Sequence, residues 1–139
     1  MLLVVSFDAA FLEGALATLG ELLETRGHAF EIVAIGGGSL LLLGLFSRPT
    51  KDVDVVALAR STLERADPLP PALRDAVKDV AAALNLAEDW LNPGPASLFD
   101  LGLPGGFRER LTVRRFGGLT IHIAGRVAFG VEDGDALLS

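Results

Sequence analysis

The spacing of hydrophobic positions changes along the chain, and each change marks an expected element. From Phe7 to Arg26, leucines and alanines recur every three or four residues, which predicts an amphipathic helix. Ser6 is the expected cap of this helix and Gly27 its expected end. The following segment, FEIVAIGG (30–37), is rich in β-branched residues and stops at glycines, which predicts a strand.

The next two patterns place a short helix before a second strand. SLLLLGLF (39–46) is apolar on all sides, as in a short buried helix. DVDVVAL (52–58) then alternates and predicts a strand. Because side chains alternate across a strand, Asp52 and Asp54 are expected on one face and the neighbouring valines on the other.

The second half begins with a helix and ends with a hairpin. Pro71–Leu84 carries apolar residues at helical spacing behind a proline. Residues 85–106 are rich in proline and glycine, and we expect an ordered loop with Trp90 as a core plug rather than a base-stacking platform. Two alternating segments, 110–116 and 119–124, join at a Gly-Gly pair, which predicts a hairpin. This order of elements predicts an α/β (α+β) fold, a mixed sheet flanked by helices.

Composition limits the classes of function. The 139 residues are expected to form one domain, 1–139. A net charge of −6 argues against a general nucleic-acid binder, which needs clustered cations. The chain has no cysteine and two histidines, so disulfides, thiolate catalysis, cysteine zinc sites and histidine-rich metal centres are excluded.

The sequence shows neither a secretory signal nor a membrane-spanning segment. The apolar start has no basic residue and meets Asp8 early, unlike a secretory signal. The longest apolar run, 33–46, is broken by glycines and is shorter than the roughly 20 residues that cross a bilayer. We therefore expect a cytoplasmic protein without a membrane association.

The two aspartates are the main candidate for chemistry. Carboxylates two residues apart on a strand share a face, with Cα atoms about 7 Å apart. On an exposed face, both can hold Mg²⁺, and such pairs serve phosphoryl and nucleotidyl transfer. The alternative is a strand whose outer face is merely polar.

The glycine turn at Gly36–Ser39 lies between the expected strand and helix. Glycines allow a phosphate to approach the backbone, and Ser39 is either a helix cap or a phosphate ligand. A tight turn without a ligand is the alternative. No Gly-Lys-Ser/Thr follows, and Leu41 occupies the third glycine position of a dinucleotide fingerprint, so a Walker A loop and a dinucleotide-binding domain are excluded.

Together these features resemble the nucleotidyltransferase fold superfamily, which includes DNA polymerase β. GGGSLLLLGLFSRPTKDVDVV looks like its AbiEii-like branch of bacterial toxin–antitoxin and phage-defence systems. EDWLN (88–92) and GGLTIHIAGR (117–126) also resemble that group. The resemblance covers roughly 12–126, and its matching positions are Gly37, Gly38, Ser39, Arg48, Thr50, Asp52 and Asp54.

The resemblance implies a role for each matching residue. Asp52 and Asp54 would be catalytic and hold Mg²⁺ or Mn²⁺. A nucleoside triphosphate would be bound by Gly37, Gly38, Ser39, Arg48 and Lys51. The acceptor would be RNA, such as tRNA, or a partner protein. Arg48 and Lys51 have a second interpretation, as solvated charges before the strand.

Departures from the superfamily are equally informative. Its active members use a third carboxylate on a neighbouring strand, and the expected hairpin has none there; His122 is the candidate for the third position, or an ordinary strand residue. No lysine follows the hairpin, unlike the AbiEii-like group, which suggests a shortened or degenerate member. The acids Glu132, Asp133 and Asp135 are weak substitutes.

Two hypotheses therefore stand. One is a Mg²⁺-dependent nucleotidyltransferase, and the other is an inactive interaction or antitoxin-type module of the same fold. Four arginines form the one basic cluster: Arg108, Arg110, Arg114 and Arg115. They would bind a triphosphate or RNA in the first case and be solvated hairpin cations in the second.

Overall fold

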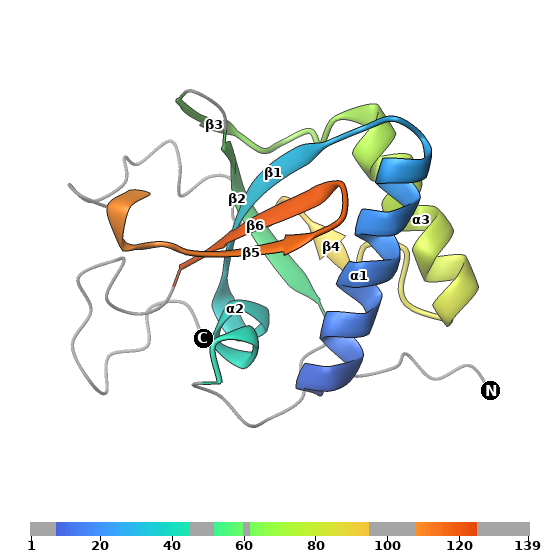
Figure 1. The fold of residues 1–139 in the computed structure, drawn as a ribbon, viewed down its shortest axis with the longest axis horizontal. Helices are drawn as coiled ribbons and strands as arrows, with labels where there is room; N and C mark the ends of the chain where they lie inside the picture. Colours follow the sequence, from blue (N-terminus) through green and yellow to red (C-terminus); the bar gives the residue numbers. More distant parts are fainter. Residues whose placement is uncertain (1–7, 45–51, 60–61, 95–107, 125–139) are drawn as a thin grey trace.

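Helices and strands are interspersed along the chain in the computed structural model (Figure 1). It describes residues 8–44, 52–59, 62–94 and 108–124. The helices are α1 (Ala9–Thr25), α2 (Gly36–Leu42), α3 (Pro71–Leu84) and the short 3-10 helix η2 (Arg108–Arg110). The strands are β1 (Phe30–Ile35), β2 (Val53–Ala59), β3 (Leu63–Arg65), β4 (Leu91–Asn92), β5 (Thr112–Phe116) and β6 (Leu119–Ile123).

The strands form a mixed sheet in the order β3-β2-β1-β6-β5, with β4 also paired to β2. β1 runs parallel to β6, and β2 runs parallel to β4. The other pairs, β1 with β2, β2 with β3 and β5 with β6, are antiparallel. The predicted α/β class and the predicted β5–β6 hairpin are therefore confirmed.

Helix α1 packs with α3 beside the sheet (Figure 1). Its leucine stripe is fully buried, as the helical spacing predicted: Leu12, Leu16, Leu19 and Leu23. Asp8 caps the helix, since its side chain accepts a hydrogen bond from the N–H of Phe11 at 2.8 Å; the expected cap, Ser6, lies outside the described residues. None of the helices in the described ranges is long and apolar enough to cross a membrane.

Trp90 joins the sheet to α3. Its indole ring is fully buried, and Nε1 donates a hydrogen bond of 2.9 Å to the carbonyl of Val77. The predicted core plug is confirmed. The expected loop is corrected at the next two residues, because Leu91–Asn92 forms β4. The edge of β2 explains this strand: the N–H of Val53 donates to the carbonyl of Trp90 at 2.6 Å and starts the parallel pairing.

The hairpin docks on α1 through glycines. The N–H of Gly118 donates to the carbonyl of Gly20 at 2.8 Å. A Cβ at Gly20 would lie 1.4 Å from the carbonyl oxygen of Phe116. Gly117 has a φ of +59°, a conformation that glycine adopts without strain. A missing side chain on α1 therefore lets two backbones touch.

We expect Gly20→Ala to lower the free energy of unfolding by at least about 2 kcal/mol, because the hairpin must move away from the helix. Gly14→Ala is the matched control in the same helix, since a Cβ there meets nothing within 4 Å. It should stabilise the protein by about 0.5–1 kcal/mol through helix propensity. Urea unfolding measures both, and effects of the same sign would contradict the docking geometry.

Candidate functional site

The glycine turn meets the beginning of β2, where the two aspartates lie. Ile35, the last residue of β1, is the register partner of Asp54. Gly36 turns the chain out of the strand with a φ of +82°. A Cβ at Gly38 would lie 3.0 Å from the carbonyl oxygen of Asp52. The fold therefore brings the Gly-Ser turn and the Asp-x-Asp segment together.

Strand parity separates the carboxylates from the core. Val53 and Val55 are fully buried in the core that includes α1 and α3. Asp52 and Asp54 are partly exposed. Asp54 shares a face with Ile35, whose side chain belongs to a second apolar cluster. The predicted alternation across this strand is confirmed at these positions.

Asp54 is a titrating group that the fold perturbs. Its pKa rises from the ordinary 3.8 to about 6, first because burial penalises the charged carboxylate and second because Asp52 is a like charge nearby. A cation at this position would relieve both effects, since it supplies the opposite charge. The pair is therefore a natural place for a metal ion or a cationic group.

Ser39 differs from its expected place. Helix α2 begins at Gly36, its N-cap is Ile35, and no side chain caps it, so the expected helix start at residue 39 and the capping role of Ser39 are wrong. At Gly38 the lack of a side chain lets α2 lie against β2, since a Cβ there would lie 3.0 Å from the carbonyl oxygen of Asp52. Ser39 is consequently buried within the helix, and its Oγ has no hydrogen-bond partner among the described residues. Gly37 is partly exposed.

Asn92 is a neighbour of the site that the sequence analysis missed. It is the register partner of Asp54 on β4. Its amide is held at both ends, because Nδ2 donates to the carbonyl of Asp89 at 3.0 Å and Oδ1 accepts from the N–H of Gly94 at 2.9 Å. The EDWLN segment was noticed for its resemblance, but only the pairing of β4 with β2 places its asparagine beside the carboxylates.

His122 is not brought to the carboxylates. It is the register partner of Val33, so β1 separates it from β2, and its Cα lies about 10 Å or more from that of Asp54 on strand spacings. Its Nε2 lies 2.8 Å from Oε1 of Glu31. Residue 124, which follows β6 and lies on the same face as His122 but nearer to the site, is an alanine and supplies no carboxylate.

Arg114 and Arg115 of the hairpin do not share one surface. Arg114 points to the helix side, where it pairs with Glu13 at 2.6 Å and lies over the ring of Phe116. Arg115, the next residue, is exposed on the opposite face by strand alternation. The proposed phosphate-binding residues Arg48 and Lys51 and the tail acids lie outside the described residues.

The donor set at the site suits one kind of metal ion. In the described part of the chain, no three His, Asp or Glu side chains form a complete cage for a metal. Magnesium does not need a cage, because it keeps several waters and binds through one or two carboxylates together with substrate phosphates. The residues Asp52 and Asp54 fit this requirement. Tetrahedral zinc sites, with their nitrogen and sulfur ligands, do not match the same residues.

The perturbed pKa makes stability depend on pH. The folded chain keeps the Asp54 proton up to about pH 6, whereas the unfolded chain releases it near pH 4, so this group lowers stability as pH rises from 4 to 6. We expect Asp54→Asn to stabilise the metal-free protein at pH 7.5. The full effect of such a change in pKa is about 3 kcal/mol, which solvent screening reduces to about 1 kcal/mol.

The measurement is thermal or urea unfolding in a chelating buffer at pH 4 and pH 7.5. The gain from Asp54→Asn should disappear at pH 4, where the wild-type side chain is protonated in the folded protein. Asp75→Asn, at an exposed position on α3, is the control and should change stability little at either pH. An equal gain at both pH values would show that charge is not the cause.

Comparison with known proteins places the chain in a family. No curated protein and no solved structure matches it. A family model described as a nucleotidyltransferase of unknown function (DUF6036) matches residues 12–113. This range includes β1, α2, β2, α3 and β4, and therefore both the glycine turn and the aspartates. Because the match spans most of the 139 residues, the chain belongs to this family of nucleotidyltransferases.

Proposed function

We propose that the chain binds a nucleoside triphosphate with Mg²⁺ and transfers its nucleotidyl group to a hydroxyl on RNA or protein. Asp52 and Asp54 would hold Mg²⁺, or Mn²⁺ in its place. Gly37, Gly38 and Ser39 would lie along the triphosphate, with Arg48 and Lys51 as its cations. The setting would be the cytoplasm, where triphosphates and tRNA occur, in a toxin–antitoxin or phage-defence system of the AbiEii-like kind.

The observation that carries this proposal is the contact between the turn and the strand. With 3.0 Å between a Cβ at Gly38 and the carbonyl oxygen of Asp52, a phosphate held by one segment is close to the other. Gly37 on the same turn is partly exposed, so its backbone is open to phosphate oxygens, and the carboxylate pair suits a cation bound to those oxygens. Family membership supports the same reaction class.

The roles of the chain's own residues follow from their charge. Mg²⁺ neutralises charge on the phosphates and orients the leaving group when it is bound. Asp54 must be ionised to act as a ligand, and its pKa near 6 leaves it mostly ionised at neutral pH. In the transfer, the acceptor oxygen bonds to the α-phosphorus, the bond to pyrophosphate breaks, and the hydroxyl proton leaves to water or to a partner's acid.

A second candidate is an inactive interaction or antitoxin-type module. The geometry at Ser39 favours it, because an Oγ with no exposed surface cannot contact a triphosphate without movement of α2. The strand pairing also favours the inactive module. His122 lies away from Asp54, and the described strand partners of Asp54, Ile35 and Asn92, carry no third carboxylate. This candidate predicts the fold without the chemistry.

We expect Mg²⁺-dependent binding of ATP or another triphosphate to be lost in Asp52→Ala and Asp54→Ala, because each change removes a ligand of the ion. Both variants should remain folded, since neither side chain is part of the apolar core. Calorimetric titration measures the affinity, and Asp75→Ala is the exposed control. Unchanged affinity in both site variants would make these aspartates ordinary surface residues.

We also expect the isolated chain to be inactive or weakly active. Two carboxylates position one metal ion, but the charge that develops in the transition state needs fuller coordination and a cationic clamp. The test incubates the chain with labelled triphosphates, Mg²⁺ or Mn²⁺, and mixed tRNA. Strong label transfer that Asp52→Ala abolishes would contradict this expectation and exclude the inactive module.

A further inference from the structure

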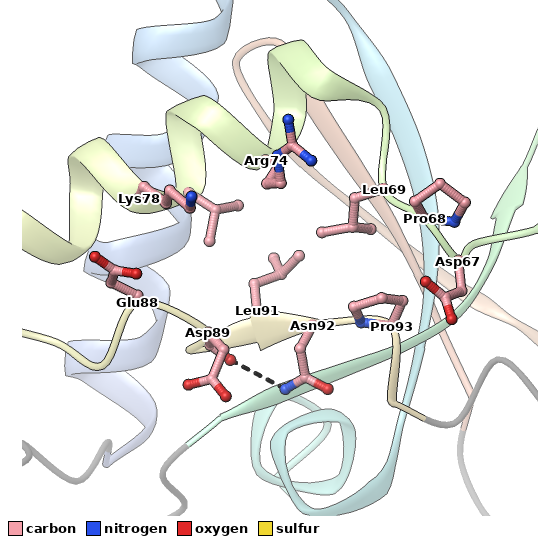
Figure 2. A pocket seen from close by; sticks show the side chains of 11 residues that line it. Asp67, Pro68, Leu69, Arg74, Lys78, Glu88, Asp89, Leu91, Asn92 and Pro93 are labelled. Atoms are coloured by element: carbon pink, nitrogen blue, oxygen red, sulfur yellow. Dashed lines mark hydrogen bonds between the residues drawn. The ribbon is translucent and has the colours of Figure 1, made fainter.

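A cavity lies between α3, the segment after β3, and β4, at the edge of the sheet next to the aspartates (Figure 2). Its volume is about 270 Å³. The centre is apolar and is formed by Leu69, Val77 and Leu91, which are almost fully buried. Two prolines, Pro68 and Pro93, extend this apolar surface on the side of the strands.

Charged side chains of both signs surround this apolar centre. Arg74 and Lys78 stand one turn apart on α3, on one wall of the cavity. Three carboxylates line the other walls: Asp67, Glu88 and Asp89. In the described structure, neither cation forms an ion pair with any of them.

The unpaired charges at the cavity contrast with an ion pair elsewhere on α3. On the same helix, Asp79 forms an ion pair with Arg26 of α1, so α3 does form ion pairs where a partner is within reach. At the cavity the opposite charges face an open space instead. Both signs therefore remain available to a ligand that carries an anionic group at one end and hydrogen-bond donors at the other.

A single nucleotide has this distribution of groups. The faces of a nucleobase are flat and apolar, and its exocyclic amino group donates hydrogen bonds that a carboxylate accepts. Its phosphate suits two cations one helical turn apart, because charge-assisted hydrogen bonds to phosphate are the strong ones. A cavity near 270 Å³ is at the small end for ligand pockets and has room for one nucleotide rather than a longer segment.

The position of the cavity relates it to the carboxylates. Asn92 lines the cavity and is also the register partner of Asp54. Leu91 is the register partner of Val53, so the apolar centre of the cavity lies on the α3 face of the sheet, opposite to the face of the two carboxylates. The rigid amide of Asn92, held by Asp89 and Gly94, forms the boundary between the two.

We propose that this cavity binds one nucleoside monophosphate unit, with its base over Leu69, Val77 and Leu91 and its phosphate on Arg74 and Lys78. This proposal rests on the proposed function, because the nucleotide in the cavity is taken to be a substrate of the proposed transfer. The unit can come from two sources, the terminal nucleotide of an acceptor RNA or the nucleoside part of the triphosphate.

The experiment titrates the full chain with AMP, CMP, GMP and UMP in a chelating buffer, using NMR or calorimetry. Mononucleotide binding should weaken about tenfold or more in the double variant Arg74→Ala/Lys78→Ala, since two charged partners of the phosphate are removed. Asp75→Ala lies on the same helix outside the cavity and should bind as the wild type does. Glu88→Gln should reduce the preference for bases that carry an amino group.

Two further arms separate the sources and the hypotheses. If the double variant weakens binding of a short RNA with a free 3′ end but not of Mg²⁺–ATP, the cavity holds the acceptor; the reverse pattern assigns it to the triphosphate. Asp52→Ala should leave mononucleotide binding unchanged. No mononucleotide binding, or equal binding by the double variant, would overturn the cavity proposal even where Mg²⁺–ATP binding upholds the proposed function.

Discussion

The close approach of α2 to the first residues of β2 is the constraint on which the site depends. A side chain at Gly38 would press on the carbonyl of Asp52, so the helix could not keep its present distance from the strand. Gly36, with its positive φ, lets the chain leave β1 and enter the helix at once. The missing side chain at Gly38 thus allows the short distance between α2 and the backbone at Asp52, and glycine at position 36 allows the turn that leads into the helix.

The elements that the sequence predicted are those in which local pattern and tertiary packing agree. The leucine spacing of α1 and the alternation of the hairpin each bury an apolar face, so pattern alone identified them. β3 and β4 have three and two residues, and they are strands only because the edge of β2 is available to pair. The irregular register between β1 and β2 is likewise a product of pairing, which no periodicity records.

The alternation along β2 could be predicted from the sequence, whereas the neighbours of Asp54 across the sheet could not. Parity along β2 predicted that Val53 and Val55 would be buried on the face opposite to the carboxylates, because a strand has a period of two. Ser39 is buried within α2 because the helix begins at Gly36, three residues before the apolar run that indicated its start. His122 is separated from Asp54 because β1 lies between β2 and β6, whereas Asn92 pairs with Asp54 because β4 lies beside β2. Strand order is a property of the whole sheet and cannot be read from a local pattern.

Trp90 gives the molecule an internal optical probe. The chain has one tryptophan and no tyrosine, so near-ultraviolet fluorescence comes from this single ring. The carbonyl of Trp90 accepts from Val53, beside the aspartates, and its indole N–H donates to Val77, which lines the cavity. Emission from a buried indole responds to its hydrogen bond and its polarity. Binding at the aspartates or in the cavity can therefore be followed in the unlabelled protein by the emission wavelength and intensity of Trp90.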